Sequence, residues 1–101
     1  MPAYAGVDLT TPDTTTDVFT NAGAADITVN VNLCNRNGAT AIVRLHVIPS
    51  GGSALPANAI EWERALAANG TLERYAITLG AGQRIAARST LANVNAVCWG
   101  A

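Results

Sequence analysis

Apolar and polar residues alternate between residues 25 and 48, and this is the strongest pattern in the chain. Such alternation is typical of β-strands that bury one face. A three-residue loop at 36–38 would place Val31 opposite Val43, whereas a two-residue turn would place Val31 opposite Arg44 and bury a charge. The segment therefore predicts a β-hairpin at the centre of a sheet. Its alternating apolar positions are Ile27, Val29, Val31, Leu33, Ala41, Val43, Leu45 and Val47.

Residues 59–68 fit two different structures. A helix is favoured by Asn58 as N-cap, by Glu61 three positions later and by Gly70 beyond the end. As a strand, the segment instead pairs with residues 71–79 and aligns four complementary pairs in one register. Such pairs contribute ~0.2–1 kcal/mol each and a short isolated helix is marginal in water, so we expect a second hairpin. The pairs are Arg64 with Glu73, Glu63 with Arg74, Trp62 with Tyr75, and Ile60 with Ile77.

The two ends of the chain predict a third hairpin and an N-terminal arm. Residues 83–89 and 93–100 are expected to form the strands of that hairpin. Residues 1–24 hold only scattered apolar residues, so we expect an extended arm that a partner orders, with a possible edge strand around Val7 and Leu9. A loosely attached tail is the alternative.

These segments together predict an all-β fold. We expect an antiparallel, jelly-roll-like β-sandwich of six to eight short strands, formed as one domain by residues 25–101 and preceded by the extended arm. Residues 49–58 are rich in glycine, serine and proline and are expected to form a surface loop. That loop lacks the lysine and the following helix of a phosphate-binding loop, so we expect no nucleotide there.

The charge content changes the expectation for the surface. Charged residues make up 13% of the chain, against about 25% in an average soluble domain. The net charge is -1, and all six basic residues are arginine. Neither nucleic acid nor an acidic membrane is therefore an expected partner. Protein interfaces are enriched in arginine and depleted in lysine, which favours a surface covered by neighbours, including further copies of this chain; compositional drift in a GC-rich genome is the alternative.

The chain start and the cysteines bear on location. The first residues show no basic and apolar signal pattern, and no run is long enough to span a bilayer, so we expect neither export nor a membrane anchor. Cys34 and Cys98 are then expected to be two free buried thiols. The alternative is an exported, immunoglobulin-like adhesion module with a bridge between these two cysteines.

No residue pattern predicts catalysis, a metal or a cofactor. His46 is the only histidine, so it lacks the partners of a zinc site and leaves no base for a serine nucleophile. Glu61 and Glu63 would lie about 7 Å apart on one side of a strand, a spacing found in inverting glycosidases. Because Glu63 already has Arg74 as its expected partner, we expect a structural pair and not an enzyme.

Three aromatic residues form the most distinctive candidate binding set. Trp62, Tyr75 and Trp99 could build a flat platform on which sugars stack, as in carbohydrate-binding β-sandwiches. Cross-strand aromatic residues are more often part of a core, or anchors of a protein interface, than a sugar platform. Both interpretations remain open at the level of sequence.

Several segments carry a resemblance to the small all-β virion structural proteins of tailed bacteriophages. These segments are VNLCNR (31–36), VRLHVIPSG (43–51), IEW (60–62), LAANGTLER (66–74) and ANVNAV (92–97). The resemblance implies a β-sandwich that decorates or cements a capsid, or that caps part of a tail. It also implies strand and not helix around residues 60–66.

From this resemblance we expect a non-enzymatic virion protein. Its most fitting role is a capsid decoration or cement protein, assembled in the host cytoplasm, that binds across adjoining major capsid subunits or other virion proteins. The alternative is a tail or fibre accessory protein that binds a glycan or receptor. The residues expected to make the protein contacts are Val7, Leu9, Arg44, His46, Arg84, Arg88 and Trp99.

Overall fold

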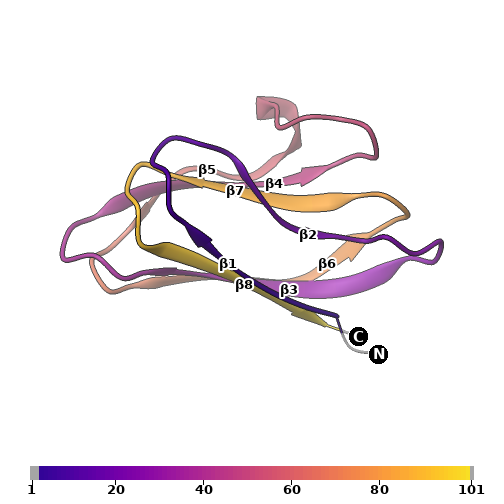
Figure 1. Cartoon of the computed structure of the whole chain (residues 1–101), viewed down its shortest axis with the longest axis horizontal. Coiled ribbons are helices and arrows are strands. Elements are labelled where there is room, and N and C mark those ends of the chain that lie inside the picture. The colour runs from indigo at the N-terminus through magenta and orange to yellow at the C-terminus, as the bar shows by residue number, and fades with distance from the viewer. Residues whose placement is uncertain (1–2, 101) are drawn as a thin grey trace.

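Two four-stranded antiparallel sheets pack face to face in the computed structural model, which describes residues 3–100 (Figure 1). Sheet A has the strand order β1-β8-β3-β6, and sheet B has the order β2-β7-β4-β5. The expected all-β sandwich is confirmed. The strands are β1 (Ala3–Leu9), β2 (Thr16–Thr20), β3 (Ile27–Asn35), β4 (Ala41–Ile48), β5 (Ala59–Leu66), β6 (Thr71–Leu79), β7 (Arg84–Ser89) and β8 (Val94–Gly100), with a short 3-10 turn η1 (Pro56–Asn58) before β5.

The chain changes sheet at every connection between strands except the one from β4 to β5. Each sheet therefore pairs strands that are distant in sequence, such as β1 with β8 and β2 with β7. This order, with all neighbours antiparallel, is that of an eight-stranded jelly roll.

The expected central hairpin is wrong. Strand β3 pairs with β6 and β8, and β4 pairs with β5 and β7, so Val31 lies opposite Cys98 and Arg74 and not opposite Val43. Alternation defines which face of a strand is buried. It does not distinguish a neighbour in the same sheet from a strand that faces it across the core. The expected β7–β8 hairpin is wrong for the same reason, because those strands also lie in different sheets.

Residues 59–66 form a strand, as expected, but the four predicted pairs with β6 do not form. Strands β5 and β6 are edge strands of opposite sheets on the same side of the sandwich. The Arg74 guanidinium spans this side and donates to Glu61 Oε2 at 2.5 Å and to the Ile60 carbonyl at 2.7 Å. The opposite charges on β5 and β6 had suggested that these strands pair in one sheet. Instead, the Arg74 side chain on β6 links its sheet to β5 of the other sheet.

The expected arm is instead part of the sandwich. Strand β1 forms one edge of sheet A and β2 forms one edge of sheet B. Leu9 and Val18 are buried in the core between the sheets. The expected edge strand is present, whereas the expectation of a separate arm over residues 1–24 is corrected; residues 1, 2 and 101 lie outside the described part.

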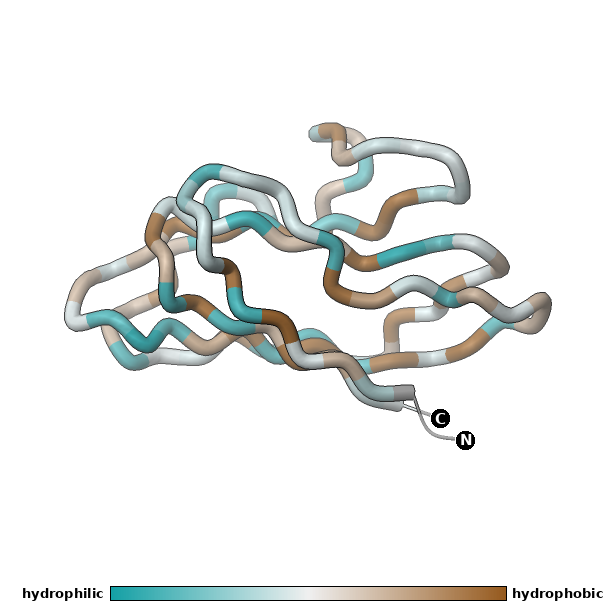
Figure 2. Tube along the Cα trace, viewed as in Figure 1, coloured by the Kyte–Doolittle hydropathy of each residue, from teal (hydrophilic) through white to brown (hydrophobic). Residues whose placement is uncertain are grey.

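The core consists of the inward positions of both sheets, and Figure 2 shows apolar and polar residues alternating along the strands. Burying this apolar surface is the main term that favours folding. Large side chains from both sheets interdigitate there without exposure to solvent. Among the fully buried ones are Leu9, Val29, Val31, Leu33, Val43, Leu45, Leu79, Ile85 and Val94.

Asn21 and Asn35 are buried and make the same set of hydrogen bonds at two crossings between the sheets. The Asn35 amide donates to the carbonyl four residues on and to two consecutive carbonyls at the end of β5, at 2.8, 3.0 and 3.2 Å. The Asn21 amide does the same at the end of β6, at 2.9, 3.0 and 3.2 Å. In both, Oδ1 accepts from the N–H two residues on. These amides satisfy carbonyls that strand pairing leaves free.

Residues 49–58 fold over the outer side of sheet B, where Figure 1 shows the loop and η1 beside that layer. Under it lie His46, Ile48 and Ala86, which are buried on the outer side of the sheet. Arg84 Nη2 donates to the Gly52 carbonyl at 3.0 Å and holds the loop against β7. The loop therefore creates a small second cluster outside the main core.

Candidate functional site

The outer face of sheet A, which we call face A, presents neutral polar and aromatic side chains. Three rows cross its strands, and each row contains residues that the strand pairing places opposite one another. Both carboxylates on this face have a polar partner: Asp8 is paired with Arg36 at 2.9 Å, and Glu73 accepts from Tyr75 and Asn32. The rows are Asp8, Asn95, Cys34, Thr71; Gly6, Val97, Asn32, Glu73; and Tyr4, Trp99, Asn30 with Tyr75.

The third row carries three aromatic rings, which we call the aromatic row: Tyr4, Trp99 and Tyr75. Tyr4 lies directly opposite Trp99. Tyr75 packs edge-on against Trp99, with ring centres 6.4 Å apart and planes at 81°. Tyr4 is 72% exposed and Tyr75 is 60% exposed. This group holds the two most exposed of the large apolar side chains among the described residues.

A β-bulge sets the position of Tyr75. Tyr75 and Ala76 together lie opposite Asn30, and Ala76 has a φ of 57°. The Asn30 Oδ1 accepts a hydrogen bond from the Ala76 N–H at 3.0 Å, which fixes the bulge. Bulges redirect side chains, and here the extra residue lets Tyr75 point to the outer face while Ile77, two positions on, packs against the core. The Tyr75 hydroxyl donates to Glu73, and this bond raises the pKa of Tyr75.

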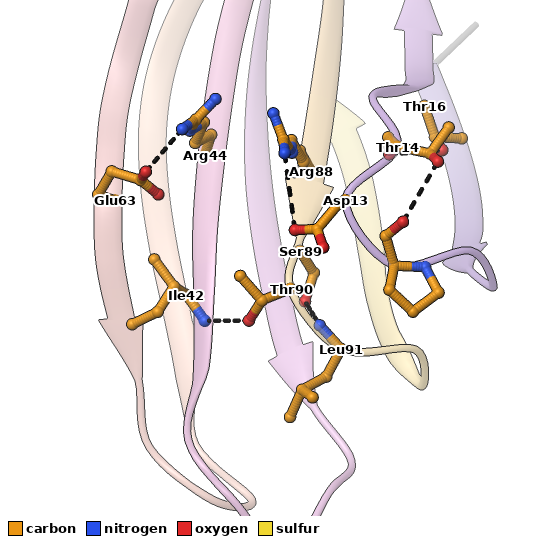
Figure 3. Close-up of polar contacts among 11 residues, drawn as sticks. Asp13, Thr14, Thr16, Ile42, Arg44, Glu63, Arg88, Ser89, Thr90 and Leu91 are labelled. Carbon is orange, nitrogen blue, oxygen red and sulfur yellow. Dashed lines mark hydrogen bonds and ion pairs between the residues drawn. The ribbon is translucent and has the colours of Figure 1, made fainter.

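The outer face of sheet B, which we call face B, holds a row of charges. Arg44 and Arg88 lie directly opposite each other on β4 and β7. Each has an acidic partner on its far side, Glu63 at 2.6 Å and Asp13 at 3.6 Å, as Figure 3 shows. The hydrogen bond between Glu63 and Arg44 lowers the pKa of Glu63 and raises the pKa of Arg44. The order of charges across face B is Glu63, Arg44, Arg88, Asp13, and their net charge is zero.

Trp62 lies on face B and not with the other aromatic residues. The Arg44 guanidinium stacks 3.9 Å from its ring centre, a cation–π contact. His46 meets the same ring edge-on at 6.3 Å. The His46 Nδ1 lies 2.8 Å from Asn58 Oδ1, which also accepts from the Leu55 N–H, so Nδ1 is the donor. His46 therefore serves to hold the 49–58 loop.

Every arginine of the chain is in an ion pair. The six arginines share five carboxylates of the same chain, because Arg64 and Arg74 both contact Glu61, and each guanidinium has an acidic partner. The pairs are Arg36 with Asp8, Arg44 with Glu63, Arg64 and Arg74 with Glu61, Arg84 with Asp17, and Arg88 with Asp13.

The structure divides the expected contact residues among different environments. Leu9 and His46 are only 1% and 3% exposed, so both are withdrawn from the contact set. Val7 is partly buried on the inner side of β1. Trp99 lies on face A, whereas the three arginines of the set, Arg44, Arg84 and Arg88, lie on sheet B, where each is paired with an acid.

The expected sugar platform of Trp62, Tyr75 and Trp99 does not form, because its three residues lie on two different faces. Trp62 is on face B, and only Tyr75 and Trp99 come together on face A. Tyr4, which was not expected there, completes the row because residues 3–9 join the sheet as β1. Its sequence signal was weak, since Tyr4 stands in a segment without a long alternating pattern.

The two cysteines are free. Cys34 points to face A and is partly exposed, while Cys98 on the neighbouring strand is fully buried. Burial raises the pKa of the Cys98 thiol to about 11. The expectation of two buried thiols holds for Cys98 and is corrected for Cys34.

Within residues 3–100 there is no cluster of three or more potential metal ligands and no detectable pocket. That part of the chain also has no helix with the length and apolar character needed to cross a bilayer. Glu61, one half of the carboxylate pair considered from sequence, is engaged by two arginines.

Comparison with known proteins gives no match to a protein-family model, a curated protein or a solved structure.

Proposed function

We propose that this chain is a non-enzymatic structural protein of a phage particle that decorates or cements the capsid. It binds through face A across adjoining major capsid subunits and so resists their separation. The sequence segments that resemble phage virion proteins support this proposal, and so does the character of face A.

The observation that carries the proposal is the aromatic row. Aromatic residues are enriched among the residues that contribute most to protein binding, and such residues lie near the centre of an interface. Tyr4, Trp99 and Tyr75 occupy adjoining positions on face A. Truncating an aromatic residue at the centre of an interface commonly weakens binding by about 2 kcal/mol or more.

The surroundings of this row also favour a protein partner. The neighbouring positions hold Asn30, Asn32 and Asn95, whose amides can hydrogen-bond to a partner without the desolvation cost of a charge. On face B, by contrast, the arginines are paired with acids of the same chain. Breaking those pairs would cost binding energy, so face B is the side that we assign to solvent.

Two measurements test this proposal. Mass spectrometry of washed, purified particles should detect the polypeptide at a fixed ratio to the major capsid protein. Particles lacking the protein should rebind the wild type, and Trp99→Ala should weaken this binding at least tenfold. Trp62→Ala, which removes the same ring from face B, is the matched control and should bind like wild type. Absence of the polypeptide from washed particles overturns the proposal.

A second candidate function is a glycan- or receptor-binding role in a tail or fibre, favoured by the same row. Exposed aromatic rings next to Asn30 and Glu73 are typical of saccharide sites. The 81° angle between the Tyr75 and Trp99 planes argues against it, because both rings cannot lie flat under one sugar ring. A glycan array with wild type and Trp99→Ala separates the two functions: a cement protein should bind no glycan.

A further inference from the structure

The four edge strands of the sandwich differ in regularity. An exposed edge offers unpaired N–H and C=O groups to another chain, and proteins commonly block such edges with bulges. The pairing of β2, β5 and β6 with their neighbours is interrupted by register shifts, twice in the case of β5. The pairing of β1 with β8 runs without a shift from Ala3 to Leu9. Within residues 3–100, β1 is therefore the one edge strand without this protection.

The composition of β1 adds no other barrier. The strand contains neither proline nor lysine, and its single charge, Asp8, is neutralised by Arg36. Val7 lies on the inner side of this edge strand and is only partly buried against the core. An added strand would cover that apolar surface.

We propose that β1 pairs with β1 of a second copy of this chain, antiparallel about a two-fold axis at Gly6. The two A sheets then form one continuous eight-stranded sheet, twice the four strands of each copy. This proposal does not depend on what face A binds.

The self-pairing is supported by side-chain complementarity. With Gly6 facing Gly6 of the second copy, Ala5 faces Val7 and Tyr4 faces Asp8. Inner residues meet inner residues and outer residues meet outer residues, as a shared sheet requires. The carboxylate of Asp8 then lies across from a tyrosine, which can donate a hydrogen bond to it.

Gly6 suits the position on the axis. A side chain there would meet only Tyr4, whose hydroxyl is 3.4 Å from the place of a Cβ, so the Tyr4 ring leans over the glycine. Two facing glycines leave room for the rings of both copies at the centre of the contact. Tyr4, the most exposed of the large apolar side chains, lies beside this contact.

The contact is small, so a moderate affinity is expected. A single pair of short strands buries less than the about 1,200 Å² typical of stable complexes. The dimer should therefore depend on concentration, and packing of many copies on a particle would favour it through a high local concentration.

Charge substitutions at Gly6 test the axis directly. Gly6→Lys and Gly6→Glu each place like charges opposite one another at the dimer interface, and each should weaken dimerisation roughly tenfold or more. An equimolar mixture places opposite charges together, so heterodimers should form with a dissociation constant within about threefold of wild type. Sedimentation velocity gives the affinities, and native mass spectrometry identifies the heterodimer by mass.

Thr78→Lys and Thr78→Glu are the matched controls, because Thr78 is exposed on β6 at the opposite edge of sheet A. These variants should dimerise like wild type, and far-ultraviolet circular dichroism should confirm that all variants keep the strand content. A wild type that stays monomeric at millimolar concentration overturns the proposal. So does a Gly6→Lys variant that dimerises normally, or a mixture without heterodimers. None of these results bears on particle binding, which has its own test.

Discussion

Arg44 and Arg88 lie side by side on neighbouring antiparallel strands, a placement that is unfavourable for two like charges unless each is compensated. Glu63 compensates one and Asp13 the other, from opposite sides of the row (Figure 3). The two acids belong to β5 and to the β1–β2 connection, so the row ties both flanks of sheet B to its central strands.

This row predicts a dependence of stability on pH. The folded-state pKa of Glu63 is below its ordinary value because of Arg44. The resulting stabilisation is present above the ordinary carboxyl pKa and is lost as the pH falls through the lowered value. Denaturant titrations from pH 7 to pH 3 should show Glu63→Gln losing less stability on acidification than wild type. Asp26→Asn, an exposed carboxylate in the β2–β3 connection, is the control; equal acid sensitivity of Glu63→Gln and wild type would contradict the prediction.

The two buried asparagines should be among the most sensitive polar positions. Asn35→Ala removes a donor from the buried Leu66 carbonyl and Asn21→Ala removes one from the buried Leu79 carbonyl, and an unsatisfied buried group costs roughly 1–3 kcal/mol. Urea denaturation should show a loss of about 2 kcal/mol for each variant. Asn32→Ala, which removes a partly exposed amide from face A, should change stability by less than about 0.5 kcal/mol. A loss no greater than that of the control would show that the two amides are not structural.

The bulge in β6 predicts a stabilising substitution. Ala76 has a φ of 57°, a conformation that costs a residue with a Cβ about 1 kcal/mol and costs glycine little. Ala76→Gly should therefore raise the free energy of unfolding by up to about 1 kcal/mol. Ala65→Gly on β5, where φ is not positive, should lower it. Thermal and urea denaturation of both variants measure the difference, and destabilisation by Ala76→Gly would mean that the bulge is not strained.

The thiols should differ in reactivity. Cys98 is fully buried with a pKa raised to about 11, so its reactive thiolate is scarce at pH 8, whereas Cys34 is partly exposed on face A. A thiol reagent at pH 8 should modify one cysteine rapidly in the native protein and both in denaturant. Peptide mapping should identify the fast one as Cys34. A native protein without reactive thiols and two daltons lighter than its reduced form would instead indicate the disulfide of the alternative hypothesis.

The raised pKa of Cys98 also predicts that the free energy of unfolding depends on pH in the alkaline range. Since the folded-state pKa is raised, its contribution is complete below the ordinary thiol pKa and is lost as the pH rises through about 11. Cys98→Ala should therefore lose less stability than wild type between neutral pH and pH 11, as measured by denaturant titration.

How far sequence predicts this fold is clear from β3 and β4. Alternation correctly assigned Val29, Val31 and Leu33, and Val43 and Leu45, to a buried face. It could not assign the strand partners, because neighbours within a sheet and strands facing across a core need the same alternation. Long-range pairing, such as β1 with β8, has no local signal at all.

The candidate site was predictable in part. Trp99 and Tyr75 stood out as aromatic residues on alternating strands, and they do meet on face A. Tyr4 joins them only because β1 pairs with β8. His46 illustrates the opposite limit: its outward position on β4 suggested a surface contact, but the 49–58 loop buries it through Asn58.

The central claim, that face A is the surface by which this protein binds a capsid, is tested most directly by a cryo-electron microscopy map of the particle. We predict two-layered density on the outside of the head, at junctions of major capsid subunits, with Trp99 and Tyr75 turned toward the capsid and Arg44 and Arg88 toward solvent. Density in which face A is turned to solvent, or a head without such density, would contradict the claim.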